Sequence, residues 1–190
     1  DAKKNNAVIL ENQKVIKVDK DNTYWKIYLN CGKVIKSKIL INASGPWINE
    51  TLKDVIKIKS YKKIRLIKGS HIIVNKLYKQ ETALTLQNDD KRIIFVIPYK
   101  EKFSLIGTTE VEVKDPENKG IEENEIKYLI DSVNNYFQKQ ISTNDILETY
   151  SGIRPLIEDF KEATKVSRDY VFDFSKENEL PLISIYGGKL

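Results

Sequence analysis

Two of the chain's four arginines lie in segments suited to binding an anion. Arg154 lies within residues 151–156, where a glycine and a proline can direct its side chain out of a strand, and Arg168 follows shortly after. Two guanidinium groups converging on one phosphate would each form charge-assisted hydrogen bonds, worth roughly 1.5–3 kcal/mol apiece. The alternative is a pair of surface arginines, with Arg168 salt-bridged to Asp169 or Glu162.

Two turns that contain glycine could bring the backbone close to a ligand. The first comes directly after the apolar run 39–41 and consists of Asn42, Ala43, Ser44 and Gly45. Small residues there permit a close approach, and amides at the start of a helix can face an anion. In the second turn, Gly187 and Gly188 could admit a flat ligand while Lys189 faces an anion. An ordinary turn is the alternative for both.

The general signatures of several enzyme classes are absent from the sequence. It contains no GxGxxG, P-loop, HExxH, CxxC or GxSxG motif. One histidine, His71, and one cysteine, Cys31, are a poor basis for a metal site, and no serine is marked as a triad partner for His71. The sequence therefore predicts no metal.

The composition is that of a globular chain in a reducing compartment. With 190 residues, of which 41% are hydrophobic and 31% charged, the chain can bury a core. The net charge of +5 is almost entirely lysine, and we do not take it as a sign of nucleic-acid binding. A lone cysteine cannot form an internal disulfide, which favours the cytoplasm. No leader opens the chain, no apolar run approaches the roughly 20 residues of a membrane helix, and the absence of methionine suggests an excerpt.

The hydrophobic pattern predicts an α+β protein with many short strands and few helices. Apolar residues at three-to-four spacing predict one long helix from Glu122 to about Gln138, and a short helix is expected from Trp47 to about Val55. Residues 56–68 alternate apolar and basic, which predicts a strand with one wet face. Further strands are expected at Ala7–Leu10, Val15–Asp19, Tyr24–Leu29, Val34–Ser37, Ile39–Ile41, His71–Val74, Thr82–Gln87, Ile93–Pro98, Ser104–Gly107, Ile146–Tyr150, Tyr170–Phe174 and Leu182–Tyr186.

An ordered series of motifs carries a resemblance to a known family. The series is Asn42–Trp47, Lys68–His71, Ile97–Tyr99, Leu105–Thr109, Tyr150–Leu156, Ser167–Tyr170 and Tyr186–Leu190. It resembles the FAD-dependent glycerol-3-phosphate dehydrogenases, which belong to the D-amino-acid-oxidase-like flavoproteins. The resemblance implies a mixed, largely antiparallel substrate domain flanked by pieces of an FAD-binding α/β domain: residues 1–60 and 151–190 would belong to the FAD domain and 61–150 to the substrate domain.

The same resemblance implies roles for individual residues. It assigns the substrate phosphate to Arg154 and Arg168, and a place lining the active site to His71. Lys189 would be both catalytic and substrate-binding, beside the flavin. The segments that would approach FAD contain Val15, Asn42, Ala43, Ser44, Gly45, Gly187 and Gly188.

The implied reaction oxidises sn-glycerol 3-phosphate to dihydroxyacetone phosphate. Carbon C2 would deliver hydride to FAD while a base takes the proton of the C2 hydroxyl. His71 is a candidate base because imidazole titrates near neutrality, although a structural role remains open. Electrons would pass to quinone, with the full-length enzyme attached peripherally to the inner membrane surface. The family's glycine-rich pyrophosphate loop is missing from the sequence, so we expect the chain alone to bind FAD weakly and to have no turnover.

Two alternatives remain open at this point. The first is a glycerol-3-phosphate oxidase of the same family, which would hand its electrons to oxygen. The second is a non-catalytic basic module that uses the stretch 53–68 to bind nucleic acid or anionic lipid, with steeply salt-dependent affinity.

Overall fold

The structure is a computed structural model that describes residues 1–59, 62–118, 120–157, 169–177 and 179–187. These residues fall into two compact units, each described by itself: residues 1–63 together with 169–187, and residues 64–157. The first boundary between the two units, at 63/64, lies close to the expected boundary at 60/61. The second differs from the expected one at 150/151, because residues 151–157 continue a strand that pairs within the second unit.

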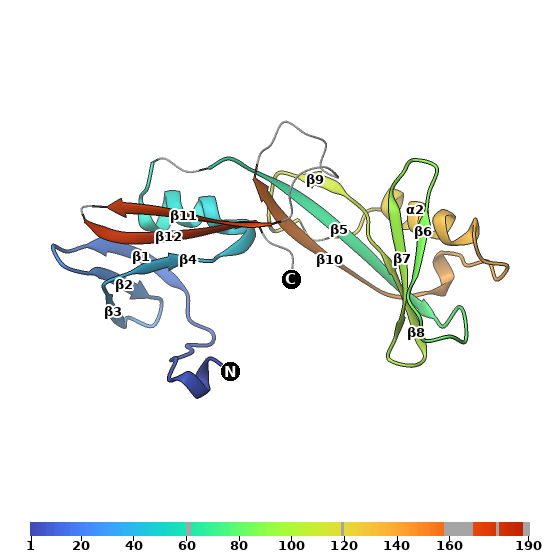
Figure 1. The fold of residues 1–190 in the computed structure, drawn as a ribbon, viewed down its shortest axis with the longest axis horizontal. Helices are drawn as coiled ribbons and strands as arrows, with labels where there is room; N and C mark the ends of the chain where they lie inside the picture. Colours follow the sequence, from blue (N-terminus) through green and yellow to red (C-terminus); the bar gives the residue numbers. More distant parts are fainter. Residues whose placement is uncertain (60–61, 119, 158–168, 178, 188–190) are drawn as a thin grey trace. The chain divides into compact units, whose positions relative to one another are not determined.

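An antiparallel sheet opens the first unit. A 3₁₀ turn, η1 (Lys3–Asn5), is followed by β1 (Val15–Lys20), β2 (Trp25–Leu29) and β3 (Val34–Ser37), paired in the order β1-β2-β3 (Figure 1). Alternation along β2 buries Trp25, Ile27 and Leu29 and leaves the residues between them on the wetter face. The strand expected at Ala7–Leu10 does not form.

A mixed sheet completes the first unit. Strand β12 (Leu180–Gly187) pairs antiparallel with β11 (Tyr170–Glu177) and parallel with β4 (Leu40–Asn42). The expected short helix is present in three pieces: a 3₁₀ turn η2 (Gly45–Trp47), α1 (Ile48–Glu50) and the π-helical segment η3 (Thr51–Ile56). Alternate residues of β12, among them Leu182 and Tyr186, are buried together with Ile48 and Leu52 of these helical pieces.

One antiparallel sheet dominates the second unit. It has the order β10-β5-β8-β7-β6, with β9 also paired to β5. The two longest strands, β5 (Ile64–Asn75) and β10 (Ile146–Ile157), run side by side along their length (Figure 1). The others are β6 (Leu84–Gln87), β7 (Ile93–Tyr99), β8 (Phe103–Gly107) and β9 (Val111–Val113). The expected strand over 56–68 was wrong in its first half, because the chain turns through a left-handed Lys57 and β5 begins only at Ile64.

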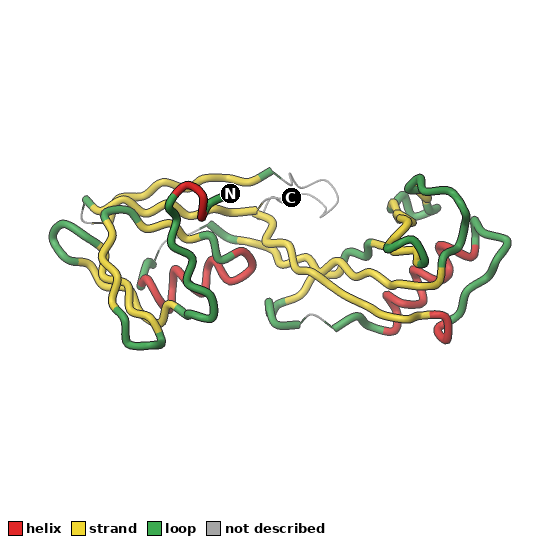
Figure 2. The backbone as a smooth tube through the Cα atoms, turned by 90° about the horizontal axis from the view of Figure 1, so that it is seen from below, coloured by secondary structure: helices red, strands yellow, loops and turns green. Residues whose placement is uncertain are grey.

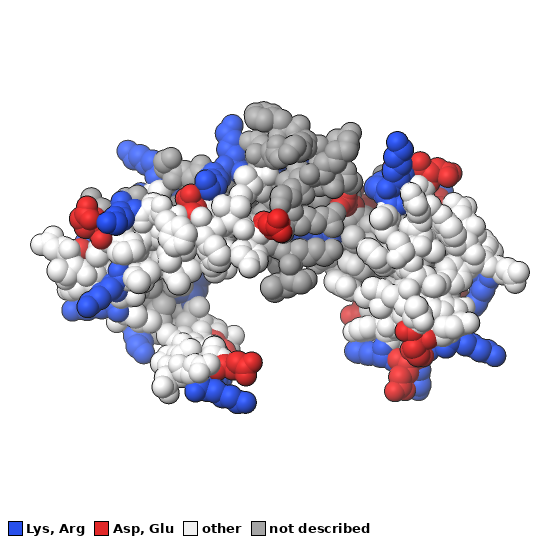
Figure 3. All heavy atoms as spheres, viewed as in Figure 1, with Lys and Arg blue, Asp and Glu red and all other residues white. Residues whose placement is uncertain are grey.

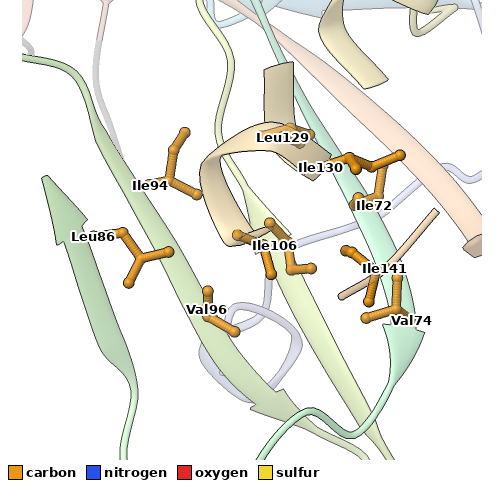
Figure 4. Packing of buried hydrophobic residues seen from close by; sticks show 10 residues of the cluster. Ile72, Val74, Leu86, Ile94, Val96, Ile106, Leu129, Ile130 and Ile141 are labelled. Carbon is orange, nitrogen blue, oxygen red and sulfur yellow. The ribbon is translucent and has the colours of Figure 1, made fainter. Parts of the chain in front are cut away.

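A long helix covers one face of this sheet. Helix α2 (Glu123–Asn134) ends earlier than expected because the Asn134 side chain bonds both the N–H and the carbonyl of Ile141, which reverses the chain. Figure 4 shows its Leu129 and Ile130 packed beside Ile72 and Ile106 of the sheet, and all four are buried. A 3₁₀ turn, η4 (Thr143–Asp145), leads into β10. Among the described residues strands predominate over helices (Figure 2), so the predicted α+β class is confirmed.

A buried ion pair ties the start of α2 to β5. Lys68 Nζ lies 2.8 Å from a carboxylate oxygen of Glu125 and donates to the carbonyl of Gly120 at 2.6 Å. Burial raises the pKa of the Glu125 carboxyl, but hydrogen bonds from Lys68, Thr109, the backbone of Glu122 and Ser70 outweigh it and hold the pKa below its usual 4.5. The charged pair is therefore kept at neutral pH by partners on every side.

We expect this pair to make the chain sensitive to acid. A carboxyl whose pKa is lowered by folding contributes stability above the unfolded-state pKa, here 4.5, and that contribution is lost as pH falls through the lower folded-state value. Urea unfolding followed between pH 6 and about pH 3 should show a steep loss of stability in the wild-type chain. In Glu125→Gln the curve should start lower and be flatter over that range. Parallel curves would contradict the prediction.

Candidate functional site

The side chain of the only histidine lies on the sheet face opposite to α2. Along β5, Ser70 and Ile72 point toward the helix, so His71 points to the other face, which we call the open face. In the register of the sheet His71 stands between Gly107 of β8 and Tyr150 of β10. Its imidazole stacks on the Tyr150 ring, with centroids 4.7 Å apart and planes 2° from parallel. The stack fixes the plane of the imidazole.

Gly107 makes room for this imidazole. A Cβ at position 107 would lie 2.6 Å from both Cγ and Nε2 of His71, well inside van der Waals contact. The ring therefore leans across the backbone of β8, with Tyr150 on its other side. No residue larger than glycine fits at position 107 while the imidazole keeps this place.

Arg154 uses a second glycine in the same way. In β10 it lies on the open face, and its terminal nitrogens would be 2.8 and 2.9 Å from a Cβ at Gly69 of β5. The hydroxyl of Thr108 would be 2.6 Å from that same point. The structure thus brings the guanidinium of Arg154 and the hydroxyl of Thr108 together above Gly69, two residues along β5 from His71. A partly buried cation next to a hydroxyl is an arrangement suited to a phosphate.

Three predicted site residues lie outside the part of the chain that the structure describes. They are Arg168, Gly188 and Lys189. The predicted convergence of two arginines and a lysine on one anion therefore stays a prediction.

The predicted cofactor residues gather in the first unit. A groove of about 380 Å³ is lined by Val15, Asn42, Ala43 and Ser44, and by residues that the sequence analysis did not single out: Gln13, Lys14, Val18, Leu40, Ile41, Thr51, Val55 and Ile56. It lies at the carboxyl end of the parallel strand β4, the position where open α/β sheets bind ligands.

Asn42 builds the turn beside this groove. Its buried side chain donates to the carbonyl of Ile48 at 3.1 Å and accepts from the Ser44 hydroxyl at 2.7 Å. Gly45 follows with φ +58°, a left-handed conformation that favours glycine, and Gly187 ends β12 with φ +69°. The groove fits a planar, largely apolar part of FAD, because small side chains at 43 and 44 let a ring reach the backbone and most of the remaining lining is apolar. Gly45 and Gly187 are not among its lining residues.

A larger hollow of about 530 Å³ opens elsewhere in the first unit. It is lined by Leu52, Lys57, Ile58, Lys59, Asp173, Ser175, Leu182, Ser184 and Tyr186. None of these is a predicted site residue, and the carboxylate of Asp173 is paired with Lys62 at 3.1 Å. Although this hollow is larger than the groove, no residue of β4 or of the turn after it lines the hollow. The groove, and not this hollow, therefore has the position expected of a cofactor site.

The sequence analysis assigned no role to four residues of the open face. Gly69, Gly107, Thr108 and Tyr150 all lie in motifs that carry the family resemblance. Glycine inside a strand, at 69 and 107, is the signal that could have indicated them, because it marks a close approach to the backbone. Partial burial raises the pKa of the Tyr150 hydroxyl, with a smaller effect from Tyr99, so the group stays a neutral hydrogen-bond donor beside His71.

Two features relevant to other kinds of site are not seen in the described part of the chain. No helix there has the length and apolar character needed to cross a bilayer. No three His, Cys, Asp or Glu side chains come together there as metal ligands. Cys31 is a free, exposed thiol.

Comparison with known proteins identifies the family of this chain. The model of the family described as FAD dependent oxidoreductase matches residues 1–178, so the chain belongs to this family. Its cofactor class is thereby FAD. The aerobic glycerol-3-phosphate dehydrogenase of Escherichia coli K12 is 50% identical over 154 residues, which is 80% of this chain and 31% of the relative.

Two further relatives cover the chain almost completely. The D-erythritol 1-phosphate dehydrogenase of Brucella abortus is 36% identical over 97% of this chain and 38% of its own length. The crystal structure of the glycerol-3-phosphate dehydrogenase from Bacillus halodurans, complexed with FAD, aligns over all of this chain and 37% of its own with a TM-score of 0.79 and 27% identity. The chain therefore spans about a third of the length of the curated relatives it matches.

Proposed function

We propose that this chain is part of an FAD-dependent dehydrogenase that oxidises sn-glycerol 3-phosphate to dihydroxyacetone phosphate. The observation that carries the proposal is that Arg154 and His71 lie on one open sheet face: the Arg154 guanidinium, from β10, lies over Gly69, which is two residues from His71 along β5. Relatives named for phosphorylated three- and four-carbon polyols support a substrate with a terminal phosphate. In this proposal the first unit belongs to the FAD domain and the second is the substrate domain.

Arg154 would bind the substrate phosphate, with the Thr108 hydroxyl, which donates to the carbonyl of Thr109 at 3.1 Å, lying beside it. Gly69 provides the space, because a side chain there would meet both groups. By the family resemblance Arg168 and Lys189 complete the anion site. Such contacts bind substrate and transition state alike and chiefly lower KM.

His71 would hold the C2 hydroxyl and accept its proton as the C–H bond breaks. An imidazole is suited to this because it can be neutral at physiological pH. Its stack on Tyr150 and its contact with Gly107 keep it in one orientation, which is a main part of what a protein supplies to such a step. FAD, when bound, is the acceptor of the hydride from C2. The groove at Val15 and Asn42–Ser44 would hold part of that cofactor.

Quinone as the electron acceptor and peripheral attachment to the inner membrane surface are further parts of the proposal. They follow from the resemblance to the glycerol-3-phosphate dehydrogenases. The oxidase alternative, with oxygen as the acceptor, shares the same open face, and an acceptor assay separates the two.

The binding-module alternative is disfavoured by the state of the basic stretch 53–68. Lys68 is completely buried and paired with Glu125, and Arg65 forms a two-point ion pair with Glu112. In the view of Figure 3 the basic side chains are scattered and acidic ones lie among them. Two of the basic side chains on which a polyanion would depend are therefore already engaged by carboxylates.

The proposal is tested by anaerobic flavin reduction in the full-length enzyme that contains this sequence. Addition of sn-glycerol 3-phosphate should bleach the flavin absorbance and produce dihydroxyacetone phosphate, and a soluble quinone should restore the absorbance faster than oxygen does. Unphosphorylated glycerol serves as the control and should leave the flavin oxidised at the same concentration. Bleaching by glycerol alone, or by neither compound, would contradict the proposal.

A further inference from the structure

The buried network beneath the open face connects the groups to which a role in the reaction is proposed. Four of its members, Lys68, Ser70, Thr109 and Glu125, are at most 4% exposed. One carboxylate oxygen of Glu125 accepts hydrogen bonds from the hydroxyls of Ser70, at 2.8 Å, and Thr109, at 2.6 Å. The other oxygen accepts from the backbone N–H of Glu122 at 2.9 Å and lies beside Lys68.

This network fills a gap in the ladder of the sheet. Strand β5 pairs with β8 from Asn75 to His71 and with β9 from Lys68 to Leu66, so the register skips Gly69 and Ser70 on this side. Across the gap, the Thr109 N–H donates to the Ser70 carbonyl at 3.3 Å, and the Ser70 N–H donates to the Thr109 hydroxyl at 2.9 Å. Glu125 clamps the two hydroxyl-bearing residues from below, where regular strand pairing is interrupted.

Each clamped residue is the sequence neighbour of a group on the open face. Ser70 lies between Gly69, over which Arg154 sits, and His71, and Thr109 directly follows Thr108. Successive side chains of a strand point to opposite faces, so a residue held below fixes the backbone that carries its neighbour above. Loss of a hydrogen bond between Glu125 and Ser70 or Thr109 would therefore shift both the His71 imidazole and the backbone of Gly69 beneath Arg154.

We propose that Glu125 is a positioning residue, which acts through Ser70 and Thr109 on the placement of His71 and of Gly69, the residue over which the Arg154 guanidinium lies. The inference rests on the proposed function for its kinetic consequence. Its structural part, the hold on His71, can be measured without any activity. It requires that loss of one clamp hydrogen bond loosens the His71–Tyr150 stack in a chain that remains folded.

His71 is the only histidine of this sequence, and in the full-length enzyme its imidazole signal is assigned as the one that His71→Gln removes. In the full chain, the nearly parallel Tyr150 ring shifts the imidazole C–H resonances by its ring current, and Tyr150→Leu defines the value without the stack. In Thr109→Val and Ser70→Ala, each of which removes one neutral hydroxyl, these resonances should move toward the Tyr150→Leu positions. Glu125→Gln should move them further. The matched control is Asp131→Asn, which breaks the exposed Lys127–Asp131 pair on the same helix and should leave them unchanged.

The kinetic arm uses the full-length enzyme with sn-glycerol 3-phosphate. Thr109→Val should lower kcat/KM about 10- to 100-fold at unchanged flavin content, the size of effect expected from a displacement of about 1 Å in a reacting group. Should Glu125→Gln fail to fold, the two hydroxyl variants decide the question. The inference is overturned if folded Thr109→Val and Ser70→Ala keep wild-type imidazole resonances, or if Asp131→Asn moves them equally. An enzyme without activity on glycerol 3-phosphate would refute the proposed function while the NMR result still decides the clamp.

Discussion

Replacing Arg154 by alanine is expected to raise the KM for sn-glycerol 3-phosphate sharply and to leave kcat and the flavin content much less affected. Each charge-assisted hydrogen bond lost to the phosphate corresponds to roughly 1.5–3 kcal/mol, or about a 10- to 150-fold weaker interaction. Arg154 lies in the second unit, whereas the groove lined by Val15 and Asn42–Ser44 lies in the first. The loss should therefore fall on the substrate and not on the cofactor.

The conservative variant Arg154→Lys separates charge from shape. Lysine keeps one positive charge but lacks the planar fork that can engage two phosphate oxygens, so we expect a KM between those of wild type and Arg154→Ala. Steady-state kinetics with glycerol 3-phosphate, together with the flavin absorbance of each purified variant, give both quantities. Flavin loss that parallels the rise in KM would show that Arg154 supports the fold instead of the substrate.

Much of this molecule follows from the pattern of its sequence. Strands β2 and β12 and the start of helix α2 lie close to their predicted positions, because in each of these elements one face is buried and the other is more exposed. The predicted residues Val15 and Asn42–Ser44 line one groove, the latter because the small-residue turn directly follows β4.

The errors of the sequence analysis have physical causes that no local pattern contains. Residues 56–63 alternate like a strand, yet the members of this stretch that the structure describes, 56–59 and 62–63, belong to no strand, and the left-handed Lys57 ends the preceding helical segment instead. Helix α2 ends early because of a side-chain contact between Asn134 and Ile141. The close contacts of His71 with Gly107 and of Arg154 with Gly69 were not predicted, because they join neighbouring strands and strand register is a long-range property.

Gly107→Ala is expected to lower kcat about 100-fold, an effect comparable to misplacing a reacting group by about 1 Å. A Cβ at position 107 would overlap the His71 ring, and the stack with Tyr150 blocks the ring on its other side. The imidazole must then leave the plane in which it would meet the C2 hydroxyl. Because Arg154 is seated over a different glycine, KM for glycerol 3-phosphate should change much less than kcat.

Two neighbouring glycines provide the matched comparison for this prediction. Gly152→Ala adds its Cβ on the same face with nothing within 4 Å, and it should leave kcat and KM close to wild type. Gly69→Ala places its Cβ against Arg154 and Thr108 and should raise KM while kcat changes less. A loss of kcat in Gly107→Ala, a rise of KM in Gly69→Ala and little change in Gly152→Ala would show that Gly107 makes room for His71 alone and Gly69 for Arg154 alone. Equal losses in all three variants, accompanied by equal losses of thermal stability, would instead indicate that alanine damages the sheet, and would remove the support for separate seats.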